Sequence, residues 1–164
     1  MLTRDLVAVG AIAFGAVTLL MFAAPFLVPY GTYVDLDGTA VVIDHGWTGN
    51  GLSGVAYLIG DIFCHQQEAR SLMLNGSQMP ICIRDTGILV GMTIGFAVSW
   101  MLHLRMTDRK WAVLGLALIS VTGIEWILEH PFGDMPELRL VSGIVTGIGA
   151  GLFFAWMAYR DPVI

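Results

Sequence analysis

The residues from Leu6 to Val28 include no charged side chain, and a helix of this length can cross a membrane. The hydrocarbon core of a bilayer is ~30 Å thick, which takes ~20 helical residues to span. Three further, mostly apolar segments of comparable length cover residues 86–104, 111–128 and 138–158. The pattern predicts an all-α membrane protein with four transmembrane helices, arranged as a four-helix bundle in one integral membrane domain that covers residues 1–164.

The composition agrees with this class. Hydrophobic residues make up 56% of the 164 residues and charged residues 13%, and the mean hydropathy is +0.75. An average soluble domain holds about 25% charged residues, so the sequence excludes an ordinary soluble domain. The net charge of -5 lies mostly in connecting segments, so we expect membrane lipids and no nucleic acid among the partners. Pro25 and Pro29 end the first apolar segment without a small-residue cleavage site, which favours a retained span over a signal peptide.

The distribution of basic residues predicts the orientation. Arg105, Arg109 and Lys110 stand against only Asp108 in the short connection between the second and third spans, whereas residues 30–83 hold one basic residue, Arg70, against five acids. Because cytoplasmic loops are enriched in lysine and arginine, we expect residues 105–110 and both termini in the cytoplasm. The protein would then be a multi-pass protein of the cytoplasmic membrane. Residues 30–85 and 129–137 would both lie on its outer face.

The outer segment, residues 30–85, is too long for a bare loop. Asp37-Gly38 suits a tight turn between β-branched residues, so we expect a short β-hairpin there. Residues 54–74 read as one helix whose apolar part, Val55 to Phe63, is too short to span, so it would be a partial or interfacial helix. Residues 74–80 would then turn the chain back, and Asp85 would cap the second transmembrane helix.

Both cysteines lie in this outer segment. Cys64, His65 and Cys82 carry the thiolate and imidazole ligands that zinc and copper prefer. A fourth ligand is expected from Glu68, one turn beyond Cys64, or from the outer connection, where His130 is a candidate together with Glu129 and Asp134. The alternative is a disulfide between Cys64 and Cys82, redox-active or structural, which the oxidising compartment outside a cytoplasmic membrane permits.

The arginines near the outer boundary need counter-charges. Arg70 and Arg84 flank the turn after Cys64, and pairing with Asp61, Glu68 or Asp85 would lock the fold. The alternative is an anion site for a lipid headgroup or a small oxyanion. Within the third span, Glu125 is a functional candidate because acids are rare inside membranes, and Arg139 at the start of the fourth span is its expected partner.

Two glycine stripes predict a helix contact. Gly87, Gly91 and Gly95 recur at every fourth position in the second span, and Gly143, Gly147 and Gly151 do so in the fourth. Small residues at this spacing let helix backbones approach closely, so we expect these two helices to touch.

The clustered motifs resemble a known family. Cys64-His65-Gln66, Arg70-Ser71, Gly76, the stretch PICIRDTG from Pro80 to Gly87, and LRLVSGIVTG from Leu138 to Gly147 are similar to the signature of small predicted integral membrane proteins of bacteria and archaea. That family is catalogued as a domain of unknown function, so the resemblance implies no activity. It does imply that Cys64, His65, Arg70, Cys82, Arg84 and Arg139 form one site.

Three functions fit the sequence. The first is a membrane protein whose outer Cys/His/Arg site binds a metal or forms a disulfide, as a homo-oligomer or as a subunit of a membrane complex. The second is a membrane enzyme that acts on a lipid or isoprenoid phosphate, with the arginines holding the phosphate. The third is a small transporter or channel subunit, in which the acids of the third span act as a relay; it is the weakest because no charges run through the middle of a span.

Overall fold

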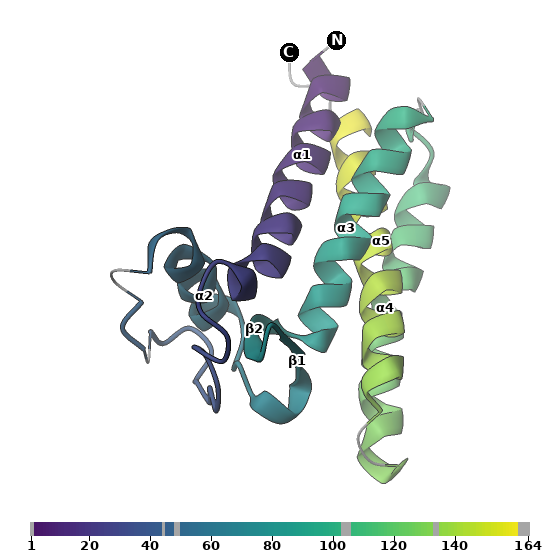
Figure 1. Ribbon diagram of the computed structural model, residues 1–164. Helices are drawn as coiled ribbons and strands as arrows, with labels where there is room; N and C mark the ends of the chain where they lie inside the picture. Colours follow the sequence, from purple (N-terminus) through teal and green to yellow (C-terminus); the bar gives the residue numbers. More distant parts are fainter. Residues whose placement is uncertain (1, 44, 48–49, 103–105, 133–134, 161–164) are drawn as a thin grey trace. The chain divides into compact units, whose positions relative to one another are not determined.

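The computed structural model describes residues 2–43, 45–47, 50–102, 106–132 and 135–160, without the side chains of residues 2, 3 and 130–132 (Figure 1). The described elements are α1 (Leu2–Ala23), η1 (Ala24–Phe26), α2 (Gly51–Phe63), η2 (Glu68–Arg70), β1 (Ser71–Leu74), β2 (Ser77–Cys82), α3 (Ile83–Met101), α4 (Arg109–Phe132) and α5 (Pro136–Arg160). The chain forms two compact units. The first comprises Met1–Ala16 and Thr86–Ile164, and the second Val17–Asp85.

Among the described residues, three helices are long and apolar enough to cross a membrane. Their apolar stretches are Arg4–Phe26, Arg109–Glu129 and Pro136–Arg160. These correspond to the first, third and fourth predicted spans. The second corresponds to α3, whose nineteen residues begin with Arg84 and Asp85 in the first turn. The structure therefore supports a mostly helical membrane protein with three candidate spans.

Glycines bring α3 and α5 of the first unit into backbone contact. A Cβ atom on Gly91 would overlap the carbonyl oxygen of Ile144, and one on Gly147 would overlap the carbonyl oxygen of Ile88. Gly95 meets Gly151 in the same way one turn further along. The contact predicted from the two glycine stripes is thus confirmed, because side chains at these positions would separate the backbones.

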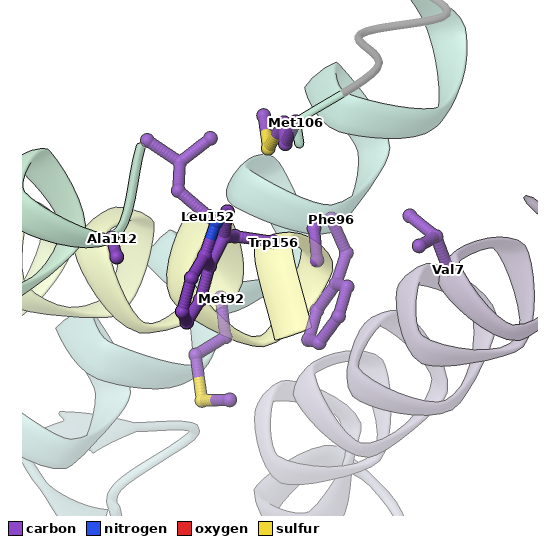
Figure 2. Close-up of a cluster of buried hydrophobic side chains, with 8 residues drawn as sticks. Val7, Met92, Phe96, Met106, Ala112, Leu152 and Trp156 are labelled. Atoms are coloured by element: carbon purple, nitrogen blue, oxygen red, sulfur yellow. The ribbon is translucent and has the colours of Figure 1, made fainter. Parts of the chain in front are cut away.

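Helix α4 lies along another face of α5. Gly115 of α4 and Gly149 of α5 allow a close approach, and the hydroxyl oxygens of Thr122 and Thr146 are 2.6 Å apart between the two helices. Buried side chains of the first unit form one apolar cluster, seven of which are labelled in Figure 2. The cluster contains Val7, Met92, Phe96, Met106, Ala112, Leu152, Ala155 and Trp156.

The second unit is built around α2 and a two-stranded antiparallel sheet of β1 and β2. Asn75 and Gly76 form the turn with φ angles of 51° and 66°, the left-handed values that two-residue hairpin turns require. The register pairs Leu74 with Ser77 and Met73 with Gln78, and it is interrupted between Met73 and Ser71. A short hairpin is therefore present, and it ends with Cys82 in β2.

The predicted hairpin around Asp37-Gly38 is wrong, because no strand forms in the described part of residues 33–47. This segment instead bonds individually to β2 and α2. The N–H of Gln78 donates to the carbonyl oxygen of Tyr33 at 2.7 Å, and the N–H of Val41 donates to that of Ile62 at 3.1 Å. Asn75-Gly76 supplies the hairpin turn, in a stretch that the sequence analysis treated only as a turn.

The predicted helix over residues 54–74 is also wrong in its second half, because α2 ends at Phe63. Cys64 is already extended, with φ -135° and ψ 152°. Gln66 takes a positive φ of 46°, which a helix cannot continue through. Asp85 differs from prediction too: it lies in the first turn of α3 and not before it. The early end of α2 frees residues 64–70 to connect the helix to β1.

Candidate metal centre

Three segment ends meet at the two cysteines. Cys64 follows the last residue of α2, Cys82 is the last residue of β2, and Asp85 lies in the first turn of α3. The two sulfurs and a carboxylate oxygen of Asp85 all lie within 4.8 Å of one another. Both cysteines are free thiols. The sulfurs are thus brought together, as the sequence analysis expected, although 17 residues separate them in the chain.

A glycine lets β2 lie directly against α2. A Cβ atom on Gly60 would overlap the carbonyl oxygen of Pro80 and the side-chain nitrogen of Gln66. Cys64 is one helical turn after Gly60, and its N–H donates to the carbonyl oxygen of Gly60 at 2.8 Å. Cys82 is two residues after Pro80. The close approach at Gly60 therefore places the two cysteines side by side.

Buried glutamines fix this approach. The side-chain amide of Gln66 donates to the carbonyl oxygens of Tyr57 at 3.2 Å and Pro80 at 3.0 Å. The side-chain amide of Gln78 donates to the carbonyl oxygen of Gln66. Tyr57, fully buried, donates its hydroxyl to the carbonyl oxygen of Gln78. These bonds link α2, the segment after it and β2 into one buried network.

Hydrogen bonds also join the three site residues. The N–H of Cys82 donates to the sulfur of Cys64 at 3.2 Å, and the thiol of Cys82 donates to Asp85 Oδ2 at 3.0 Å. The neighbouring Cys82 thiol lowers the pKa of Cys64, and backbone N–H groups of Gln66 and Cys82 act in the same direction. The contact of its sulfur with that of Cys64, followed by burial and the charge of Asp85, raises the pKa of Cys82. Cys64 is therefore the sulfur that carries negative charge more readily.

The donor set suits a thiophilic metal. In a tetrahedral zinc site, with Zn–S bonds of about 2.3 Å and Zn–O bonds of about 2.0–2.2 Å, the donor atoms lie about 3.5–3.8 Å apart. The three donors here are within 4.8 Å of one another, so shifts of about 1 Å or less would complete the geometry. Three protein ligands leave one position for water or a further ligand.

The other residues predicted for this centre lie outside the group of three. His65 and Glu68 are exposed and are not part of the group whose donor atoms meet. The side chain of His130 lies outside the described residues. Asp85, predicted as a helix cap or an ion-pair partner, contributes the third donor. Asp85 follows Cys82 by three residues, across the start of a helix. This spacing could have identified Asp85 as a ligand from the sequence.

The arginines divide between the two units. In the second unit, Arg70 is exposed at the end of η2, and Arg84 is half-buried in α3. In the first unit, Arg139 is buried and its Nε lies 2.6 Å from Oε1 of Glu129. Glu125, buried as well, accepts a hydrogen bond from the hydroxyl of Ser142 at 3.3 Å. Arg139 thus pairs with Glu129, one turn beyond Glu125, and the partnership with Glu125 that the sequence suggests stays a prediction.

Comparisons with known proteins agree on a family. The family model described as "Predicted membrane protein (DUF2085)" matches residues 64–153, more than half of the chain. The chain belongs to this family. The match begins at Cys64 and includes Cys82, Asp85 and Arg139.

A curated relative is similar over most of its length. It is an uncharacterized protein of the archaeon Methanocaldococcus jannaschii, 27% identical over 138 residues that cover 79% of this chain and 80% of the relative. No solved structure matches the chain. Family membership thus supports a membrane protein, and the chemistry has to be argued from the site.

Proposed function

We propose that this protein binds a thiophilic metal ion, zinc or copper, through Cys64, Cys82 and Asp85 on the outer face of the cytoplasmic membrane. The observation that carries the proposal is the meeting of two free thiols and a carboxylate within 4.8 Å. Sulfur ligands select zinc and copper over magnesium and calcium, which prefer oxygen ligands only. Since three protein ligands leave a position open, the centre would accept a water molecule, a partner's ligand or a substrate there.

The outer location rests on the basic residues at the start of α4. Arg109 and Lys110 begin α4, and the positive-inside rule assigns them to the cytoplasm. If α3 is a fourth span, its first turn, which holds Arg84 and Asp85, lies on the opposite side of the membrane. Its glycine contact with α5 supports this, because a helix packed along a candidate span lies at the same depth. Both termini would then be cytoplasmic.

The direct test uses the full-length protein, purified in detergent without chelator. We expect elemental analysis to find about one zinc or copper ion per chain, with both thiols reduced. Cys64→Ser and Cys82→Ser should each lose the metal, and Asp85→Asn should weaken its binding about tenfold or more. Asp37→Asn, a matched change at an exposed aspartate of the same unit, should retain it. Metal-free protein with both thiols reduced would refute the proposal.

A second candidate function is a dithiol that cycles with a disulfide, and the proximity of the two sulfurs favours it. Cys64 and Cys82 would pass two electrons and two protons to a disulfide on an extracytoplasmic partner protein, which would become a dithiol. In this case the purified protein should show thiols only after reduction and should hold no metal. Thiol counting before and after reduction therefore separates the two candidates.

A further inference from the structure

Helix α2 turns its apolar face outward. Its buried residues are Ser53, Gly54, Ala56, Tyr57, Gly60 and Asp61. Its exposed large apolar residues are Leu52, Val55, Ile62 and Phe63, whose side chains are 38–74% exposed. A helix on the surface of a water-soluble domain buries its apolar stripe and exposes its polar one. The arrangement in α2 is the reverse, so its outer face suits an apolar surrounding.

The apolar face is continuous along the helix. Positions 52, 55, 59 and 62 recur every three or four residues, which is the spacing of side chains on one helix face. Leu58 and Ile59, which lie between the exposed positions, are half-buried. Asp61, the one charged residue of α2, is 1% exposed and accepts a hydrogen bond from the indole N–H of Trp47. No charged residue of α2 therefore interrupts the face.

A hydrogen bond ties the start of α2 to the end of the first candidate span. The hydroxyl of Ser53, fully buried, donates to the carbonyl oxygen of Ala24 at 2.9 Å. Ala24 is part of the apolar stretch Arg4–Phe26, and both bonded residues belong to the second unit. Leu52 and Val55 flank Ser53 in α2, so they lie at the level of the membrane where the span ends.

Side chains satisfy the backbone at this end of the span. The last carbonyl groups of a helix have no partner within the helix, and in hydrocarbon the protein itself has to supply one. Besides the bond from Ser53 to Ala24, the side-chain amide of Asn75 donates to the carbonyl oxygens of Pro25 at 2.9 Å and Val28 at 3.3 Å. The span can therefore end within the hydrocarbon without leaving these carbonyl groups unpaired.

We propose that α2 is embedded in the bilayer from one side, with its apolar face against the acyl chains of membrane lipids. The occupant follows from the depth that the bond between Ser53 and Ala24 sets, where a water-soluble partner has no access. It follows also from continuity with Phe26 and Leu27 at the end of the span, which are 62% and 52% exposed. With thirteen residues, α2 is about 20 Å long, too short to cross a core of ~30 Å. The proposal does not depend on a metal at Cys64.

The test places the photoreactive amino acid p-benzoylphenylalanine at position 52, 55 or 63 of the full-length protein in phosphatidylcholine liposomes. We expect irradiation to add the mass of one lipid at each position, measured by mass spectrometry of the intact protein. Glu68, exposed on the polar segment after α2, is the matched control. The same amino acid at position 68 should capture about fivefold less lipid. Capture of a second protein chain in place of lipid at positions 52, 55 and 63 would overturn the proposal.

Tryptophan quenching gives an independent measurement. Leu52→Trp and Glu68→Trp each add one emitting ring, and the emission of the wild type is subtracted. In liposomes whose acyl chains carry bromine, the emission added by Leu52→Trp should fall by about half or more, and that added by Glu68→Trp should not. Unchanged emission of Leu52→Trp with a native circular dichroism spectrum would overturn the proposal. Lipid capture at position 68 equal to that at position 52 would do so too.

Discussion

At the scale of single residues, buried side chains that reach backbone carbonyl groups set the position of the candidate metal centre. Gln66 bonds to the carbonyl oxygens of Tyr57 and Pro80, and Tyr57 bonds to that of Gln78. A buried polar group without a partner costs about 1–3 kcal/mol, so each bond has to form if the segments pack at all. The glutamines therefore act on the metal centre indirectly, by fixing where α2 ends and where β2 lies.

Tyr57→Phe tests this network. Burial, followed by the electrostatic effect of the neighbouring Tyr33, raises the pKa of Tyr57 above its ordinary value near 10. The folded protein then keeps the phenol proton at a pH where the unfolded chain loses it, so stability is fully present below about pH 10 and falls as the pH rises further. We expect Tyr57→Phe to cost about 1 kcal/mol near neutral pH and to remove this alkaline loss.

Thermal unfolding of both proteins at neutral pH and at about pH 10.5 measures both effects. If Tyr57→Phe loses stability just as steeply at alkaline pH, groups other than Tyr57 cause that loss. Tyr30→Phe, at an exposed tyrosine of the same unit, is the matched control and should behave as the wild type.

At the scale of elements, the lengths of apolar segments and the spacing of glycines predicted the long helices and one helix contact. The apolar lengths identified α1, α4 and α5, and the glycine stripes identified the contact of α3 with α5. The end of α2 was missed, because residues 64–70 have a helix-compatible composition and leave the helix only through tertiary bonds of Gln66. The hairpin was misplaced for a similar reason: Asp37-Gly38 and Asn75-Gly76 carry the same kind of turn signal, and only the second is flanked by segments that pair.

The contact of α3 with α5 makes a prediction for two glycines. Gly91→Ala should destabilise the protein by about 1–3 kcal/mol, because the added methyl group meets the backbone of Ile144. Gly123→Ala in α4 is the matched control, since no atom lies within 4 Å of its added Cβ. Alanine there should stabilise the helix by up to about 1 kcal/mol. Unfolding in a denaturing detergent compares the two, and equal effects would contradict the close packing.

The ion pair between α4 and α5 makes a second prediction at this scale. Removing one partner of a buried pair leaves an uncompensated charge and costs about 3–5 kcal/mol. Arg139→Ala and Glu129→Ala should therefore each lower stability, and the double variant should lose less than the sum. Additive losses would show that the 2.6 Å contact contributes no interaction energy. Glu137→Ala, at an exposed acid of α5, serves as the control.

At the scale of the whole molecule, the proposed metal centre lies in the second unit, and what it needs from its compartment differs between the metal and the disulfide. A metal ion could bind to Cys64, Cys82 and Asp85 on either side of the membrane. The alternative, a disulfide between the two cysteines, requires the oxidising outer side. The expected homo-oligomer or membrane complex would supply what the three donors lack, a further ligand at the open position of the metal.

Orientation can be tested directly in whole cells. Single cysteines replace Asp108 or Ala40 in a background with Cys64→Ser and Cys82→Ser. An impermeant thiol reagent should label position 40 in intact cells and position 108 only after lysis, because the positive-inside rule assigns the basic residues around the start of α4 to the cytoplasm. The reverse pattern would place the Cys64 centre on the cytoplasmic side and remove the argument for a disulfide there.

X-ray absorption at the metal edge is the sharpest test of the proposed metal centre, because it counts the ligand atoms. We predict that zinc-loaded protein shows two sulfur neighbours at about 2.3 Å and one or two oxygen neighbours at about 2.0–2.2 Å. If Cys82→Ser still binds some zinc, that zinc should show one sulfur neighbour and not two. Zinc surrounded only by nitrogen and oxygen would mean that Cys64 and Cys82 do not bind it, and the proposed metal centre would be wrong.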